Sequence, residues 1–155
     1  MPNLNEQNTQ LTFPIAIVVS RFNTEVTSRL FDGAQKRLME RGFSADQVSV
    51  VHVPGAVEIP LTAQWLCETK KFRAVIALGA VIRGETDHYD YVCSMVSEGC
   101  LDVSLRFNQP VIFGVLTTDT EEQAFDRVGG RHGHKGSDCV DAACEMVALG
   151  NAIRN

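Results

Sequence analysis

The sequence is short of several features that would indicate a function directly. It has one tryptophan, and its five cysteines are odd in number and form no Cys-x-x-Cys pair. Small core side chains therefore explain the cysteines better than metal ligands or disulfides do. No apolar stretch is long enough to span a membrane. The formal net charge of −5 argues against general nucleic-acid or anionic-membrane binding, while a local basic pocket for a small anion is compatible with it.

Nucleotide-binding signatures and targeting signals are also missing. Neither Gly-x-Gly-x-x-Gly nor Gly-x-x-x-x-Gly-Lys-Ser/Thr occurs, which disfavours dinucleotide and P-loop chemistry. The polar residues 1–10 lack the basic-then-apolar pattern of a signal peptide, so we expect a cytoplasmic protein in a reducing compartment. The length of 155 residues predicts one domain, over residues 13–155. The polar residues before it predict an irregular N-terminal arm over residues 1–12.

The chain instead alternates between apolar runs and amphipathic stretches. Short, continuous apolar runs predict buried strands over residues 13–20, 48–53, 75–81 and 110–117. A helical pattern follows each run, and a last helix is expected to end near Ile153. This βαβαβαβαα order predicts an α/β fold, in which a four-stranded parallel sheet carries helices on both faces through right-handed crossovers.

The first two helices have readable borders and inward faces. Asn23 or Thr24 is expected to cap the first helix, and Gly42 is expected to end it. Pro60 requires the second helix to begin near residue 56 or 57, and we expect Trp65 to pack in its body. The predicted buried stripes are Val26, Leu30, Ala34 and Leu38 in the first helix, and Ile59, Ala63 and Leu66 in the second.

The later helices are predicted in the same way. Thr120 and Gln123 have the spacing of a capping box, so a helix should open at Thr120. Ser137 or Asp138 is expected to cap the last helix. The residues expected to point inward are Val92, Met95, Val96, Gly99 and Val103 in the third helix, and Val140, Ala143, Val147 and Ala148 in the last.

One stretch, residues 76–92, combines a strand, a glycine turn and the start of a helix. Gly84 allows a sharp turn, and Thr86 or Asp87 can cap the helix that follows. The backbone amides near Glu85 and Thr86 would then be free at the positive end of a helix, which suits a phosphate. His88, a side chain that titrates near neutral pH, comes directly after them. An ordinary corner with a solvated histidine is the alternative.

Other candidate residues also follow predicted strands. Phe22 is either a core aromatic or a stacking surface for a planar ring, and Glu58 either favours the helix dipole or accepts a hydrogen bond from a ligand hydroxyl. Together with residues 83–88 and Thr117–Thr118, they converge on the carboxyl edge of the sheet, where open α/β sheets bind ligands. The role of Phe113 is undecided from its position alone.

The glycine-rich loop over residues 129–136 is the most unusual segment. His132 and His134 have no cysteine or carboxylate at a useful ligand spacing nearby, so a metal site is disfavoured. The glycines with Arg131 and Lys135 fit an anion better, and a solvated loop is the alternative.

Five blocks of the sequence stand out: residues 19–23 (VSRFN), 53–60 (VPGAVEIP), 77–92 (ALGAVIRGETDHYDYV), 113–118 (FGVLTT) and 133–136 (GHKG). In their order and register, from about residue 15 to the end, they resemble the 6,7-dimethyl-8-ribityllumazine synthase family of riboflavin biosynthesis. The resemblance implies a flavodoxin-like fold and a transferase. It would condense 5-amino-6-(D-ribitylamino)uracil with 3,4-dihydroxy-2-butanone 4-phosphate, release phosphate and water, and need no metal or organic cofactor.

The resemblance also implies a role for each site residue. Phe22 would stack on the uracil ring, and His88 would transfer protons. Glu85 and Thr86 would seat the phosphate, with Arg127 as its charged clamp. The remaining pyrimidine and ribityl contacts would come from Ala56, Val57, Glu58, Ala80, Val81 and Ile82. Phe113, Arg127 and the region of Lys135 and Asp138 would belong to a neighbouring subunit.

The family assembles as pentamers, and some members form a shell of twelve pentamers. The short loop between the last two helices resembles that of shell-forming members, so we expect a homo-oligomer and favour the shell. Riboflavin synthase is an implied partner candidate, because it consumes the lumazine product. Two departures stand out: Ala80 replaces a frequent Thr, and Asp87 stands where Pro or Ala is frequent. We expect the backbone to serve at position 80 and Asp87 to act as a charge at the helix start.

Three alternatives are kept open at this point. An archaeal-type riboflavin synthase, which dismutates two lumazines, is disfavoured by the intact Gly-Glu-Thr phosphate seat at residues 84–86. A flavin- or nucleotide-binding module without chemistry is the second. The third is a purely structural shell protein, in which Phe22 and His88 would be replaceable without catalytic loss.

Overall fold

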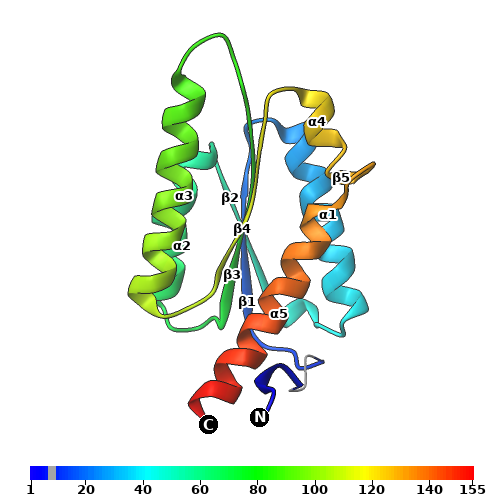
Figure 1. Cartoon of the computed structure of the whole chain (residues 1–155), viewed down its shortest axis with the longest axis vertical. Helices are drawn as coiled ribbons and strands as arrows, with labels where there is room; N and C mark the ends of the chain where they lie inside the picture. Colours follow the sequence, from blue (N-terminus) through cyan, green and yellow to red (C-terminus); the bar gives the residue numbers. More distant parts are fainter. Residues whose placement is uncertain (7–9) are drawn as a thin grey trace.

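The protein is an α/β sandwich built on one central sheet, as the computed structural model shows (Figure 1). The structure describes residues 1–6 and 10–155. The sheet holds four parallel strands in the order β2-β1-β3-β4, which confirms the predicted fold class. The strands are β1 (Ile15–Ser20), β2 (Val48–Val53), β3 (Ala74–Ile82) and β4 (Val111–Thr118).

Two helical layers cover the two faces of the sheet (Figure 1). Helices α2 (Ile59–Glu68) and α3 (His88–Phe107) cover one face, whereas α1 (Thr24–Glu40) and α5 (Lys135–Arg154) cover the other. Each layer closes its own apolar core, because successive side chains of a strand point to opposite faces. The short helix α4 (Glu121–Phe125) lies beyond the carboxyl end of β4.

The predicted inward stripes of α1 and α5 are confirmed. Their buried residues include Val26, Leu30, Ala34 and Leu38 of α1, and Val140, Ala143, Val147 and Ala148 of α5. Gly42 has φ +91°, the left-handed conformation that commonly follows the end of a helix. The capping box at Thr120 is also present, since its side chain accepts a hydrogen bond from the Gln123 amide at 3.1 Å.

Two predictions for the other layer are wrong. Trp65 on α2 and Met95 on α3 were expected to pack inside, yet they are 57% and 58% exposed. Both helices form a single layer on the sheet, so only one side of each can be buried within the chain. The residues that do point inward include Ile59, Ala63 and Cys67 of α2, and Val96, Cys100 and Val103 of α3.

The segment before α5 also differs from expectation. The helix begins at Lys135, and its capping side chain belongs to His134 rather than to Ser137 or Asp138. A two-stranded antiparallel hairpin, β5 (Val128–Gly130) with β6 (Gly133–His134), precedes it and was not predicted. Strands of three and two residues are too short to leave a periodic pattern in the sequence.

Both chain ends lie at the end of the molecule opposite α4 (Figure 1). The expected irregular arm contains a 3₁₀ turn, η1 (Leu4–Glu6), which contacts α5. The part of that expectation that concerns residues 7–9 lies outside the described residues. Within residues 1–6 and 10–155, none of the helices is both long and apolar enough to cross a membrane.

Candidate functional site

A cavity of about 390 Å³ lies where the carboxyl ends of β1, β2 and β3 meet. This is the edge at which open α/β sheets bind ligands, as the sequence predicts. The volume lies within the range of small-molecule sites. The cavity is lined by Phe22, Asn23, Pro54, Gly55, Ala56, Val57, Glu58, Ala80, Val81, Ile82, Gly84, Thr86, His88, Tyr89 and Val92.

Backbone bonds between strand ends place Phe22 at the mouth of this cavity. The Phe22 amide donates to the Pro54 carbonyl at 3.0 Å, so the segment after β1 is tied to the segment after β2. The ring of Phe22 is 71% exposed, which excludes the core-aromatic alternative within the single chain. A flat apolar surface at the rim of a cavity is suited to stacking against another ring.

Asn23 fixes the same corner from the other side. It adopts a left-handed conformation with φ 61°, and its side-chain amide donates to the Ala80 carbonyl at 2.9 Å. The predicted cap of α1 by this side chain is therefore wrong, although Asn23 does occupy the N-cap position. The bond joins the N-terminus of α1 to β3, 57 residues later in the chain, and uses the backbone of residue 80.

Glu58 is presented by a short 3₁₀ turn, Ala56–Glu58, between β2 and α2. The Glu58 amide donates to the Gly55 carbonyl at 3.2 Å, and its carboxylate is exposed beside the cavity. Pro60 stands in the first turn of α2, as predicted. The turn therefore leaves a carboxylate available to a ligand that carries hydroxyl groups.

His88 is the first residue of α3 and is exposed to the cavity. Its amide donates to the Thr86 hydroxyl at 3.3 Å, whereas Asp87 occupies the N-cap position without a side-chain capping bond. Among the described residues, the Glu85 and Thr86 amides make no hydrogen bond, so both can receive an anion. Glu85 is exposed but does not line the cavity.

Gly84 lies between β3 and the bend at residues 85 and 86, where the sequence predicts a turn. Its φ lies outside the left-handed region, and a Cβ added there would meet no atom within 4 Å. Neither backbone conformation nor packing within the chain requires a glycine at this position. Because Gly84 lines the cavity, its missing side chain leaves that space open.

Arg83 ties the start of α3 to the end of β4. Its guanidinium bonds Asp119 at 2.8 Å and lies 3.7 Å from Asp90, with its central carbon 4.2 Å from the centre of the Tyr89 ring. Burial is the main cause of the raised pKa of Tyr89, and the neighbouring Cys93 is a smaller cause. This phenol therefore stays neutral near neutral pH, and it forms part of the cavity wall.

On the other side of Tyr89 lies a second, more polar cavity of about 420 Å³. Arg127 belongs to this cavity, and so does the Thr117–Thr118 pair predicted at the end of β4. The two cavities are thus neighbours on one edge of the sheet and share Tyr89 as a wall. The full lining is Tyr89, Thr117, Thr118, Asp119, Gln123, Asp126, Arg127 and His132.

Besides Glu85, three more predicted site residues line neither cavity. Phe113 is half-buried against the core below α3, Lys135 is half-buried at the start of α5, and Asp138 is exposed one turn further on. Sequence reasoning missed Asn23 and Tyr89 as site residues. Asn23 stands inside the quoted VSRFN block, but its bond to residue 80 depends on strand order and leaves no local signal.

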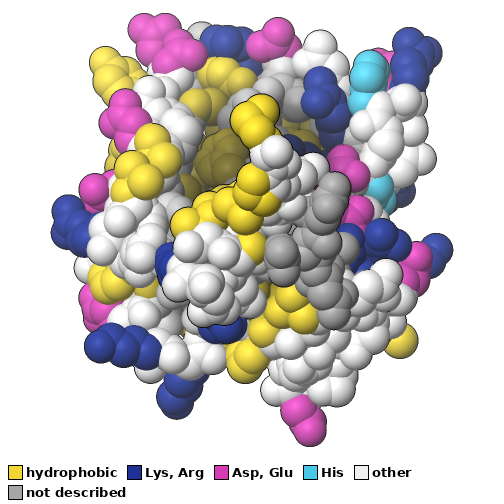
Figure 2. All heavy atoms as spheres, turned by 60° about the horizontal axis from the view of Figure 1, so that its bottom comes forward, with side chains coloured by type: hydrophobic (Ala, Val, Ile, Leu, Met, Phe, Trp, Pro, Cys, Tyr) yellow, Lys and Arg dark blue, Asp and Glu magenta, His cyan; other side chains and the backbone are white. Residues whose placement is uncertain are grey.

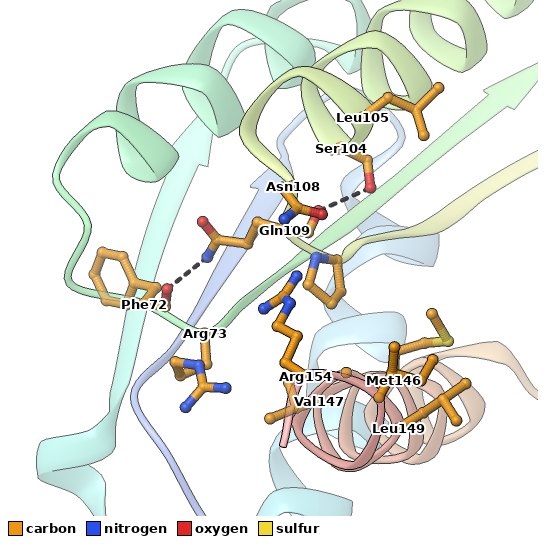
Figure 3. Close-up of a pocket in the computed structure, with 13 residues that line it drawn as sticks. Phe72, Arg73, Ser104, Leu105, Asn108, Gln109, Met146, Val147, Leu149 and Arg154 are labelled. Atoms are coloured by element: carbon orange, nitrogen blue, oxygen red, sulfur yellow. Dashed lines mark hydrogen bonds between the residues drawn. The ribbon is translucent and has the colours of Figure 1, made fainter. Parts of the chain in front are cut away.

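A third cavity, of about 340 Å³, lies at the opposite end of the molecule (Figure 3). The ends of α3 and α5 enclose it, with Arg73 and Arg154 among its polar side chains. The view from this end shows hydrophobic side chains gathered around a hollow (Figure 2). Gln109 donates to the Phe72 carbonyl at 2.6 Å, and Ser104 donates to the Gln109 carbonyl at 2.8 Å. These polar atoms are therefore already engaged in hydrogen bonds within the chain.

The cysteines are free thiols, and four of the five are buried. Burial raises the pKa of Cys100 to about 11 and that of Cys139 to about 11. Such thiols are unreactive at neutral pH, in agreement with the core role predicted for them. In the described part of the chain, no three His, Cys, Asp or Glu side chains are grouped so that they could hold a metal ion.

The parallel sheet, the two helical layers and the cavity at the carboxyl edge define a flavodoxin-like α/β protein that binds a small molecule. The family model for 6,7-dimethyl-8-ribityllumazine synthase matches residues 12–151. Two relatives, the 6,7-dimethyl-8-ribityllumazine synthases of Coxiella burnetii strains CbuG_Q212 and RSA 493, are 57% identical over 141 residues, which cover 91% of this chain and 93% of theirs. That of strain Dugway 5J108-111 is 55% identical over the same lengths. The chain belongs to the 6,7-dimethyl-8-ribityllumazine synthase family.

Proposed function

We propose that this protein is a transferase that condenses 5-amino-6-(D-ribitylamino)uracil with 3,4-dihydroxy-2-butanone 4-phosphate. The products are 6,7-dimethyl-8-ribityllumazine, phosphate and water, in the penultimate step of riboflavin biosynthesis. The observation that carries the proposal is the cavity at the carboxyl edge, where an exposed ring, a carboxylate and an imidazole come together from three segments: Phe22, Glu58 and His88.

The ribitylaminouracil is assigned to the larger, apolar part of this cavity. Phe22 stacks on its ring, and Glu58 accepts hydrogen bonds from the ribityl hydroxyls. Backbone groups at the ends of β2 and β3 bind the pyrimidine; they belong to Ala56, Val57, Ala80, Val81 and Ile82. Because Asn23 binds the carbonyl of residue 80, an alanine there keeps the backbone in place without the hydroxyl of a threonine.

The butanone phosphate is assigned to the start of α3. The Glu85 and Thr86 amides, which make no hydrogen bond among the described residues, stand just before the positive end of that helix, which favours a phosphate. The Glu85 carboxylate points away, since two anions in contact would repel. Arg127 neutralises the phosphate, with Lys135 and Asp138 behind it.

His88 is assigned to proton transfer. Imine formation, phosphate elimination, ring closure and loss of water each move a proton, and an imidazole can both accept and donate one near neutral pH. Holding two reactants in one orientation contributes further, since effective molarities reach about 10⁵ M or more. The family's chemistry needs no metal or organic cofactor in these steps.

The complete site is assigned to two copies of the chain, a single domain in each. Phe113, Arg127 and the Lys135–Asp138 region come from a neighbouring subunit, which agrees with their absence from the wall of the first cavity. Exposed apolar side chains on α2 and α3 support a homo-oligomer: they are Leu61, Trp65, Met95, Leu101 and Leu105. We assign a pentamer, with the shell of twelve pentamers as the larger form.

Cytoplasmic location and onward transfer of lumazine to riboflavin synthase belong to the same proposal.

The test is an assay of the purified protein with both substrates. Lumazine is measured by its absorbance, and the amount of phosphate released is measured alongside it. Lumazine and phosphate in equal amounts are expected. Riboflavin formed from lumazine alone would show the dismutation reaction of a riboflavin synthase instead. Tight flavin binding without turnover would identify a binding module, and assembly without either activity would identify a shell protein.

A further inference from the structure

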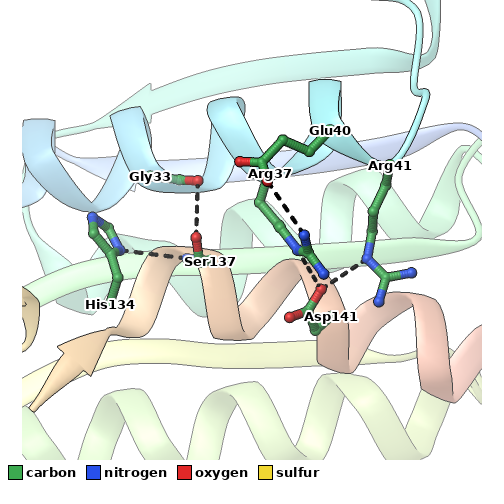
Figure 4. Close-up of polar contacts among 7 residues, drawn as sticks. All are labelled: Gly33, Arg37, Glu40, Arg41, His134, Ser137 and Asp141. Carbon is green, nitrogen blue, oxygen red and sulfur yellow. Dashed lines mark hydrogen bonds and ion pairs between the residues drawn. The ribbon is translucent and has the colours of Figure 1, made fainter.

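His134 closes the N-terminal end of α5 with its ring. Its Nδ1 accepts hydrogen bonds from the amide of Gly136 at 3.1 Å and from the amide of Ser137 at 3.4 Å, the second of which Figure 4 shows. These are two of the amides that the first turn of a helix leaves without a backbone partner. An acceptor at Nδ1 requires an unprotonated nitrogen there, so the neutral ring carries its proton on Nε2.

Two glycines form a slot that is shaped for this ring. A Cβ at Gly33 on α1 would lie 1.9 Å from Cε1 of His134, so no other residue fits opposite the imidazole. A Cβ at Gly136 would lie 2.1 Å from the Leu30 carbonyl oxygen and 3.0 Å from the same Cε1. The Ser137 hydroxyl closes the slot by donating to the Gly33 carbonyl at 3.4 Å. The ring is therefore held in one place between α1 and α5 (Figure 4).

The same turn holds the backbone of Arg127. The Lys135 amide, next to His134, donates to the Arg127 carbonyl at 2.7 Å. His134 itself is paired with Val128 in the β5–β6 hairpin. On its other side, the Arg127 amide donates to the Ala124 carbonyl at 3.1 Å. The direction in which the Arg127 side chain leaves the backbone thus depends on the hairpin that His134 anchors.

We propose that His134 is a positioning residue that acts through Arg127. By capping α5 from the slot at Gly33, its neutral ring fixes the hairpin and so aims the guanidinium at the substrate phosphate. This inference rests on the proposed function, in which Arg127 neutralises that phosphate. This role for one histidine of the glycine-rich loop requires neither a metal nor direct contact between the histidine and the substrate.

The experiment is a double-mutant cycle on the intact protein with H134A, R127A and the double variant, measured by steady-state kinetics with each substrate varied in turn. H134A is expected to raise the KM for the butanone phosphate about fivefold, the size expected from loss of a cap, with less than a twofold change in the KM for the uracil. In the R127A background the same change should leave the KM for the butanone phosphate unaltered, because the residue through which it acts is gone.

The rescue variant is H134N, since asparagine is among the strongest N-caps and restores the acceptor. It should return the KM to within twofold of the parent. Hydrogen exchange at residues 136 and 137 should be faster in H134A and near the parent rate in H134N. If H134A is poorly folded, the comparison of H134N with H134L decides, because leucine fills the slot without an acceptor and should behave as H134A is expected to.

Three outcomes overturn the inference while leaving the proposed function intact: equal rises in both KM values, an undiminished effect in the R127A background, or unchanged exchange at residues 136 and 137. A parent protein that makes no lumazine overturns the proposed function and, with it, the assigned link to phosphate. The parent assay thus separates failure of the two proposals.

Discussion

The two helical layers cover the same sheet, but they differ in the contact between their helices and in the side chains on their outer surfaces. Between α1 and α5 the contact is completed within the chain by an ion-paired cluster, in which Asp141 accepts hydrogen bonds from Arg37 and Arg41, each at 2.8 Å (Figure 4). Between α2 and α3 the contact is apolar, and large apolar side chains such as Trp65 and Met95 remain on the outside. We call α2 and α3 the unfinished layer, because their grouped exposed apolar side chains indicate a missing partner. We call α1 and α5 the closed layer, because charges complete their mutual contact, although Met39, Met146 and Ile153 are exposed there too.

The layers also carry different parts of the proposed site. His88 is the first residue of α3 and so belongs to the unfinished layer. Arg127 stands just before the hairpin that leads into α5 and so belongs to the closed one. If the two parts come from different subunits, the proton carrier and the charge clamp meet only after assembly. The predictions below test that division, beginning with the largest expected effect.

Disrupting the unfinished layer should have the largest effect. Trp65→Glu places a charge in the exposed apolar surface of α2, so we expect loss of the oligomer and at least a hundredfold loss of synthase activity, because each site would lack its second subunit. Native mass spectrometry and the lumazine assay measure the two results. Met39→Glu on α1 is the matched control: its side chain is 71% exposed on the closed layer, and both properties should be kept. An intact, active W65E oligomer would contradict the division.

Removing the proton carrier should have the next largest effect. His88→Ala is expected to lower kcat about a hundredfold or more, the usual contribution of a positioned general acid or base. Both KM values should change little, because the ring of Phe22 and the phosphate seat are untouched. Steady-state kinetics with intact oligomer, verified by native mass spectrometry, provides the measurement. A kcat within threefold of the parent would remove His88 from the chemistry.

Removing the charge clamp should alter binding rather than turnover. Arg127→Ala is expected to raise the KM for the butanone phosphate about tenfold or more, since a hydrogen bond to a charged group contributes about 1.5–3 kcal/mol. The KM for the uracil should change far less. Arg131→Ala is a control, as Arg131 is exposed in the same hairpin region but lines neither cavity of the carboxyl edge. Equal rises in both KM values for R127A would exclude its phosphate role.

The smallest effect is expected at the ion-paired cluster of the closed layer. Burial by itself would raise the pKa of Asp141, but hydrogen bonds from Arg37 and Arg41 hold it below its ordinary value of 3.8. Its stabilising contribution is therefore present above about pH 4 and is lost as the pH falls through the lower pKa of the folded state. Asp141→Asn should cost about 1 kcal/mol of the free energy of unfolding at pH 7, a modest value because the carboxylate is 42% exposed.

Thermal unfolding of the parent and D141N between pH 7 and pH 2.5 provides the measurement. The difference between their melting temperatures should shrink below about pH 4, as the Asp141 carboxylate of the parent becomes protonated. A difference that stays constant over this range would mean that the carboxylate charge contributes nothing to the seam between α1 and α5.

Local patterns in the sequence were sufficient for the strands, the stripes of α1 and α5, and the carboxyl edge at which the cavity lies. Features that depend on distant residues were not predictable. The cap of α5 by His134 requires the slot at Gly33, more than 100 residues earlier in the chain. The bond from Asn23 to residue 80 depends on β1 and β3 lying side by side. Trp65 is exposed because it lies off the buried side of α2, which includes Ile59 and Ala63, so the expectation for it was wrong on the helical periodicity itself.

The distribution of the thiols has a practical consequence. Cys93 is the one cysteine that is partly accessible, while the other four are buried. A maleimide dye should therefore attach to this position in the folded protein and leave the remaining thiols unmodified. Since Cys93 adjoins Tyr89, the wall between the two cavities, the attached fluorophore would report on ligand entry without any cysteine having to be removed or introduced.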